Sequence, residues 1–316
     1  MSQKHEGWGW MLAVDFFFAG MGGAMLVIAG IVDLFVGEGR TSALASFLGA
    51  AFMALGSGLL IFELGRPFQS WRVFMNPRAI LTVGAWVMSL AICAGLVYTT
   101  FSFAVFPWSD WVLVRKLVAV VIVVSGLIVA TYPGVLLGRL KGRPLWVGPG
   151  MTSLFLTSSL VTAFAAHILC GMIVAPATIG DVLARFPAIT AVLLAVQLLL
   201  WVSYMWVKIS GATEAEAVAA RRLLCGEYSS AFKYGLMLVG TVLPLLLVLV
   251  SSPLYQAAGA ILVLVGGFIL RMLVIYAGGA DRTWLPGEVK YRSRLPHGDE
   301  AFMKAWNEKE FWTTNK

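Results

Sequence analysis

Charged residues are scarce in this chain. They make up 12% of its 316 residues, whereas hydrophobic residues make up 59%. A water-soluble domain needs more polar surface than this balance supplies, so the composition indicates a polytopic membrane protein. The net charge of +7 lies mainly in loops between apolar runs, which favours a role in membrane topology and not in nucleic-acid binding.

Residues that bind redox metals are also few. The three cysteines lie far apart without metal-ligand spacing, and an iron–sulfur cluster normally takes about four thiolates. Two of the three histidines lie in the polar termini, and only His167 lies deep in an apolar run. A bis-histidine haem needs two ligands within the membrane. We therefore expect neither a haem nor an iron–sulfur cluster in this chain, and we interpret His167 as structural more readily than functional.

Long apolar runs dominate the sequence and predict an all-α integral membrane fold. A span needs about 20 residues, and the chain has room for about eight of them with short connections. The polar start lacks an apolar run followed by a small-residue cleavage site, so we expect no removable signal peptide. Ala212–Ala217 reads as the capped start of a surface helix. The predicted spans are residues 10–36, 41–64, 80–103, 112–140, 152–174, 187–209, 232–250 and 256–277.

The loop charges predict the orientation. The cations on one side are Arg66, Arg72, Arg78, Arg139, Lys141, Arg143, Lys208, Arg221, Arg222 and Lys233, with those of the tail. The cations on the other side are Arg40, Arg115, Lys116 and Arg185. By the positive-inside rule, both termini are expected in the cytoplasm. Arg115 and Lys116 begin the fourth span, where we expect them to snorkel outward.

Glu63 and Arg66 stand together where the second span ends, in the stretch Glu63–Pro67. Charge at the edge of a span is expensive unless it is paired or hydrated, so such a group is a functional candidate by default. The alternative is a structural Glu63–Arg66 ion pair that fixes the end of a helix before a proline.

Three further polar residues approach the same face. Asp15 precedes three phenylalanines near the start of the first span, where it could hold or relay a proton; alternatively, lipid headgroups hydrate it. Tyr132 precedes Pro133, which can kink the fourth span and direct the hydroxyl into a cavity; alternatively, Tyr132 belongs to the interfacial aromatic belt. Arg271 lies within the last span, close enough to its end to snorkel.

Several short motifs occur in an order that resembles the NrfD/polysulfide reductase membrane-subunit family. The likeness covers nearly the whole hydrophobic portion of the chain. Each motif is weak alone, but together they are fairly specific. They are Leu64–Pro67 with Trp71-Arg72 and Asn76–Arg78, then Tyr132–Leu137, Pro144–Trp146 and Leu264–Arg271.

The resemblance implies eight helices built as two four-helix bundles, in a prokaryotic inner (plasma) membrane. We accordingly divide the chain into a first bundle with a quinone site (1–140), a second bundle (141–280) and a polar cytoplasmic tail (281–316). The implied ligand is a quinone or quinol, either menaquinone or ubiquinone. The implied partners are membrane lipid, a ferredoxin-like iron–sulfur subunit and a molybdopterin catalytic subunit, with no nucleic acid.

Carried over by position, Glu63 and Tyr132 match the carboxylate and tyrosine of the family's quinone site. Asp15 stands where relatives often have a histidine or another polar residue, and Pro133 replaces the threonine of the family's Tyr-Thr-Gly. The resemblance thus makes Glu63, Asp15 and Tyr132 candidate catalytic residues. Candidate cofactor-binding residues are Asp15, Glu63, Arg66, Tyr132 and Arg271.

These observations suggest an anchor that exchanges electrons between quinone and an iron–sulfur partner. Polysulfide reductase has its catalytic subunits outside the cytoplasm, whereas the loop charges here favour a cytoplasm-facing complex, such as a sulfite-oxidising molybdoenzyme or another enzyme of sulfur compounds. Two alternatives stay open. One is a secondary transporter, which would suit spans interrupted by glycine and proline. The other is a purely structural anchor without a quinone site.

Overall fold

The computed structural model describes residues 9–37, 39–63, 71, 73–75, 80–140, 142–148, 150–174, 180–210 and 213–280, and these residues contain helices and no strands. The first long helices are α1 (Trp10–Phe35), α2 (Ala43–Glu63), α3 (Ile80–Thr100), α4 (Val112–Gly138) and α5 (Gly150–Ile173). The others are α6 (Gly180–Leu183), α7 (Phe186–Ser210), α8 (Glu214–Cys225), the π-helix η3 (Ala231–Val242), α9 (Leu243–Val248) and α10 (Pro253–Ala280).

Eight helices in the described residues are long and apolar enough to cross a membrane. Their bounds agree with the predicted spans to within a few residues, so the prediction of an all-α membrane fold with eight spans is confirmed. The predicted helix after the sixth span is also present, as α8, but its N-cap residue Thr213 makes no side-chain capping hydrogen bond. The predicted tail, residues 281–316, lies outside the described residues.

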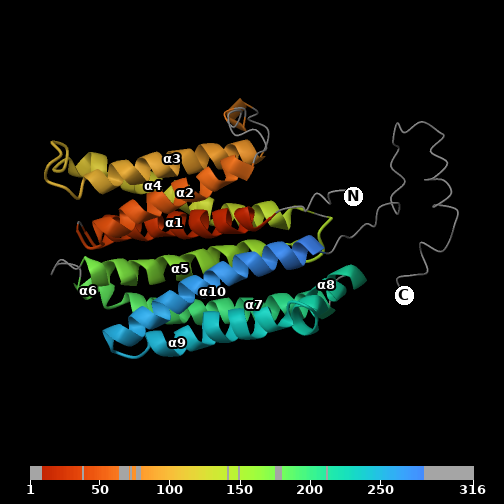
Figure 1. Cartoon of the computed structure of the whole chain (residues 1–316). Coiled ribbons are helices and arrows are strands. Elements are labelled where there is room, and N and C mark those ends of the chain that lie inside the picture. Colours follow the sequence, from red (N-terminus) through yellow and green to blue (C-terminus); the bar gives the residue numbers. More distant parts are fainter. Residues whose placement is uncertain are drawn as a thin grey trace, which may run out of the picture.

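The long helices lie side by side, with α1–α4 on one side of the bundle and α5–α10 on the other (Figure 1). Helix α1 begins and α10 ends at the same end of the bundle, which we call the terminal end (Figure 1). Helix α1 packs on α2, α4, α5 and α10, and α4 packs on α5. The two groups therefore share a broad interface, and the division into two four-helix bundles at residue 140 stays a prediction.

Glycine lets α1 and α4 approach until their backbones touch. A Cβ atom added to Gly23 would lie 2.8 Å from the carbonyl oxygen of Gly126 on α4, closer than real Cβ atoms come to such an oxygen. A side chain at either position would push the helices apart. The two helices therefore pack closely through small residues.

At the end of the bundle opposite the terminal end, Arg115 does not snorkel outward. Its side chain is buried, and its Nε lies 3.2 Å from Oδ2 of Asp33, which is also buried. The sequence prediction was wrong here because a carboxylate on α1 faces the guanidinium, and in a medium without water this pairing replaces hydration.

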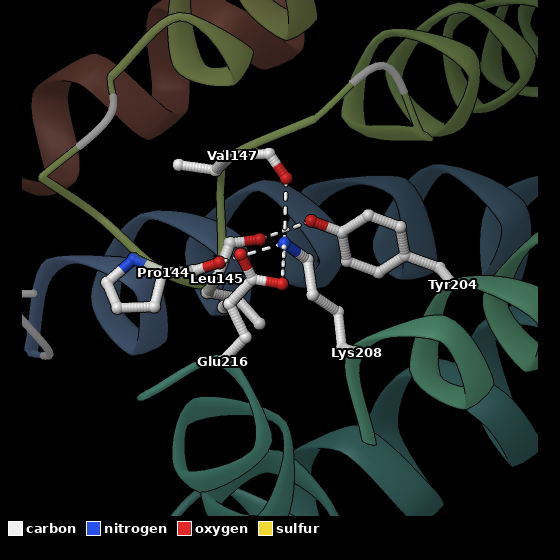
Figure 2. Close-up of polar contacts among 6 residues, drawn as sticks. All are labelled: Pro144, Leu145, Val147, Tyr204, Lys208 and Glu216. Carbon is white, nitrogen blue, oxygen red and sulfur yellow. Dashed lines mark hydrogen bonds and ion pairs between the residues drawn. The ribbon is translucent and has the colours of Figure 1, made fainter. Parts of the chain in front are cut away.

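At the terminal end, the segment Arg143–Val147 crosses from α4 towards α5 and is fixed by side chains of α7 (Figure 2). We call this segment the strap. Lys208 Nζ donates hydrogen bonds to the carbonyl oxygens of Pro144 at 2.9 Å and Val147 at 2.7 Å. The Tyr204 hydroxyl donates to the Leu145 carbonyl oxygen. The strap is therefore anchored through its own backbone carbonyls.

Two other elements complete this attachment. Glu216 of α8 lies 3.1 Å from Lys208 Nζ and balances its charge (Figure 2). Trp146 Nε1 donates to the Val274 carbonyl oxygen of α10 at 2.7 Å, and Arg143 donates to that of Gly279. The strap thus joins the end of α4 to α7, α8 and α10.

The seventh span differs from the expected α-helix, because its first twelve residues form the π-helix η3. Thr241 Oγ1 donates to the Leu236 carbonyl oxygen five residues earlier, at 2.9 Å. Pro244 at the start of α9 has no N–H to give to the Gly240 carbonyl. A widened turn before this proline accommodates the missing hydrogen bond, and the apolar pattern of the sequence carries no signal for it.

Substituting Glu216 tests whether the Lys208 pair holds the terminal end together. Glu216→Gln leaves a buried ammonium without its carboxylate, which typically destabilises a protein by about 3 kcal/mol or more. We expect a clearly lower melting temperature of the purified chain in detergent. The matched control is Glu227→Gln, since Glu227 pairs with Arg222 at 3.6 Å at a largely exposed position, where the expected loss is under about 1 kcal/mol. Equal shifts would contradict the role given to Glu216.

Candidate functional site

The structure brings Asp15 and Tyr132 to the same region of the terminal end. Asp15 lies in the second turn of α1 and is 2% exposed. Tyr132 lies about two turns before the last residue of α4. Because α1 begins where α4 ends, the two side chains have a similar depth. Both residues thus lie at the same end of the bundle, and their meeting in one ligand site stays a prediction.

A glycine from a neighbouring helix faces each of these side chains. A Cβ atom added to Gly56 of α2 would lie 2.9 Å from Oδ1 of Asp15. A Cβ atom added to Gly84 of α3 would lie 2.7 Å from Cε2 and Cζ of Tyr132 and 3.0 Å from its hydroxyl oxygen. Four helices thus meet around the two polar groups. The sequence analysis singled out neither glycine.

The hydroxyl oxygen of Tyr132 is buried, and none of the described residues hydrogen-bonds to it. Buried polar atoms in proteins almost always have a partner. A phenol can donate one hydrogen bond and accept others, so this hydroxyl suits a ligand with a carbonyl or hydroxyl oxygen. With the carboxyl group of Asp15 nearby, the site can offer two hydrogen-bonding groups to one small polar headgroup.

Two of the expected site residues lie partly or wholly outside the described part of the chain. Glu63 is the last residue of α2 and so belongs to the terminal end, but its side chain is not among the described ones. Arg66 lies outside the described residues altogether. The Glu63–Arg66 cluster therefore stays a prediction from the sequence.

Arg271 has different surroundings. Its guanidinium is fully buried, so it does not snorkel as its position in the sequence would have allowed. It donates hydrogen bonds to the hydroxyls of Ser158 and, at 3.1 Å, Ser159 on α5, and to the Gly267 carbonyl oxygen at 2.9 Å. The hydroxyl groups and the carbonyl of its own helix solvate the charge in place of water.

Aromatic rings enclose the same guanidinium. It lies over the rings of Phe17 and Phe155, 5.8 Å and 5.7 Å from their centroids. Phe17 belongs to α1 and Phe155 to α5, so Arg271 contributes to the interface between the two groups of helices. These contacts with described residues do not involve Asp15 or Tyr132, and the predicted part of Arg271 in ligand binding stays a prediction.

A family model described as "Polysulphide reductase, NrfD" matches residues 2–280, which is most of the chain. The chain belongs to the NrfD polysulphide reductase family. It is 26% identical over 300 residues to the C subunit of the polysulfide reductase of Wolinella succinogenes, an alignment that covers 86% of this chain and 94% of the relative. It is 23% identical over 307 residues to an NrfD homolog of Haemophilus influenzae, with the same two coverages.

As an NrfD-family chain with eight apolar helices, the protein is a multi-pass membrane protein. Two motifs that carry the resemblance now have structural roles. Pro144–Trp146 forms most of the strap, where Trp146 bonds to α10. In the Tyr132–Leu137 motif, a Cβ atom on Gly134 would lie 2.5 Å from Cα of Thr152, so the end of α4 touches the start of α5.

His167 has a structural place in this NrfD chain. Its Nε2 donates to the Met25 carbonyl oxygen of α1 at 3.0 Å, and its ring packs edge-on against Phe186. These contacts tie α5 to α1 and to the start of α7. Among the described residues, no three His, Cys, Asp or Glu side chains gather as a metal site would require.

The serines around Arg271 provide a test of how its charge is solvated. Ser159→Ala removes an acceptor from a fully buried guanidinium, and an unsatisfied buried donor costs about 1–3 kcal/mol. We expect a lower melting temperature in detergent. The control is Ser203→Ala, because that hydroxyl bonds within its own helix at an exposed position. If both variants melt like the wild type, Ser159 does not stabilise the cation.

Proposed function

We propose that this chain is the membrane anchor subunit of an oxidoreductase complex and exchanges electrons between quinone or quinol and an iron–sulfur partner. The family supports the class of protein, and one relative is itself a subunit of a polysulfide reductase. The observation that carries the proposal is the buried Tyr132 hydroxyl to which none of the described residues hydrogen-bonds, at the same end of the bundle as the buried Asp15.

The residues present fit a quinone headgroup. Reduction of a quinone takes two electrons and two protons and turns two carbonyl oxygens into hydroxyls. Tyr132 can donate a hydrogen bond to one oxygen of the headgroup. Asp15 can form a hydrogen bond with the headgroup or supply a proton to it. The apolar helices around these groups exclude water and bury the ring.

We further propose that Glu63 carries protons between Asp15 and the water beyond the terminal end, beside the charge of Arg66. Glu63 ends α2 at that end of the bundle, which places it nearer to the surface than Asp15. The role is that of a relay, which needs a group that can both bind and release a proton near working pH.

We propose that the electrons come from or go to a cluster in a ferredoxin-like subunit. That subunit in turn exchanges electrons with a molybdopterin subunit. This chain has three cysteines, fewer than the four thiolates that a cluster normally takes. Loop charge supports a cytoplasmic position of the terminal end and of both termini. A complex that oxidises sulfite or another sulfur compound in the cytoplasm would fit that orientation.

Purification identifies the partners directly. The tagged chain would be extracted in a mild detergent, and the proteins that accompany it would be named by mass spectrometry. An iron–sulfur protein together with a molybdopterin protein supports the proposed complex. The chain alone, without bound quinone, would instead favour a transporter and remove the basis of the proposal.

Tyr132→Phe tests the chemistry within that complex. The substitution keeps the ring and removes one hydrogen bond, which we expect to lower quinol-dependent turnover by about tenfold, the equivalent of about 1.4 kcal/mol. Tyr255→Phe is the control, because Tyr255 is an exposed tyrosine at the other end of the bundle. Turnover would be measured with a soluble quinol analogue.

Glu63→Gln then distinguishes the site from a structural anchor. In a proton-relay role the complex assembles but its quinol turnover falls. In a purely structural role the turnover of the assembled complex stays at the wild-type level. The assembled fraction would be measured by size-exclusion chromatography in each case.

A further inference from the structure

Gly56 and Gly84 are among the closely packed glycines whose nearest neighbouring atom belongs to a side chain. Gly22, Gly23, Gly49 and Gly126 have a backbone oxygen of a partner helix as the nearest atom, so they bring helices together. The nearest atoms to Gly84 are all side-chain atoms of Tyr132, and the nearest atom to Gly56 is the carboxylate oxygen of Asp15.

Glycine inside a helix needs a reason, because it is less favourable than alanine by about 1 kcal/mol. A carbon atom at 2.7 Å from two ring carbons of Tyr132 is far inside their contact distance of about 3.5 Å or more. A methyl group at residue 84 would therefore displace the phenol ring by on the order of 1 Å. A methyl group at residue 56 would likewise move the Asp15 carboxyl group.

We propose that Gly56 and Gly84 are positioning residues of the quinone site. Their missing side chains determine where the Asp15 carboxyl and the Tyr132 hydroxyl lie between the four helices, so that both groups reach one headgroup with polar oxygens. This inference rests on the proposed function, and it adds α2 and α3 to a site whose polar groups come from α1 and α4.

Position matters at such a site because hydrogen bonds to the headgroup depend on geometry. A misplacement of about 1 Å at a reacting group can lower a rate by about a hundredfold. The hydroxyl of Tyr132 lies 3.0 Å from the place of a Cβ atom on Gly84, so the displacement would act on the polar atom itself as well as on the ring.

The experiment uses the full chain in detergent and a short-chain naphthoquinone as the probe. The dissociation constant would be measured by isothermal titration calorimetry for the wild type and for Gly84→Ala, Gly56→Ala and Gly58→Ala. Gly58 lies on the same helix as Gly56 but has nothing within 4 Å of its Cβ position, which makes it the matched control. We expect about ten- to hundredfold weaker binding for the first two variants and less than about twofold change for the control.

Repeating the Gly84→Ala substitution in the Tyr132→Phe variant distinguishes a positioning role of Gly84 from a packing role. In Tyr132→Phe the ring carbons remain but the hydroxyl is absent, so Gly84→Ala should still lower the melting temperature while having little further effect on binding. Such coupling between the two substitutions is the result expected of a positioning residue. An equal loss of binding in both backgrounds would show that Gly84 serves packing alone, and it would overturn the inference.

The two possible failures are distinguishable. If the wild type does not bind the quinone, the proposed function fails and the inference fails with it. If the wild type binds the quinone, and Gly84→Ala and Gly56→Ala bind it as tightly as the wild type does, only the inference fails. Should Gly84→Ala not fold, Tyr132→Ala in the same chain makes room for the methyl group. Recovery of folding would assign the defect to the ring contact, and continued misfolding would contradict that contact.

Discussion

The absence of water in the bilayer core governs this structure. A charge placed there must find partners within the protein, and the described charges do so in different ways. Asp33 forms an ion pair with a guanidinium. Lys208 pairs with a carboxylate and donates hydrogen bonds to two carbonyl oxygens. Arg271 donates hydrogen bonds to two hydroxyls and a carbonyl oxygen and lies over two aromatic rings. Each solution joins different helices, so the polar groups also determine which helices pack together.

Helix α1 shows how one helix can serve two purposes. Asp15 and Asp33 are eighteen residues apart, about five helical turns, and so lie on the same face. The carboxylate of Asp33 pairs with Arg115 of α4. The other lies against a glycine, near a phenol that none of the described residues hydrogen-bonds. The same residue type thus stabilises one end of the helix and can act chemically at the other.

The sequence predicted what depends on local pattern. Span length and hydropathy located the eight helices, and the chain direction placed Asp15 and Tyr132 at one end. It did not predict the partner of Arg115, the burial of Arg271 or the glycines opposite Asp15 and Tyr132. Each of these depends on which faces of distant helices meet, and a single sequence carries no record of that. The π-helix was missed because a widened turn leaves hydropathy unchanged.

The position of Tyr132 depends on helices that lie outside the site. About two turns after it, α4 ends and the chain enters the strap, whose carbonyls are held by Lys208 and Tyr204 of α7. Trp146 then joins the strap to α10, and Gly134 brings the end of α4 against α5. The second group of helices therefore fixes the last turns of α4 from outside. Contacts of α7, α8 and α10 at the terminal end thus help to hold the end of α4, although the site's described groups come from α1 to α4.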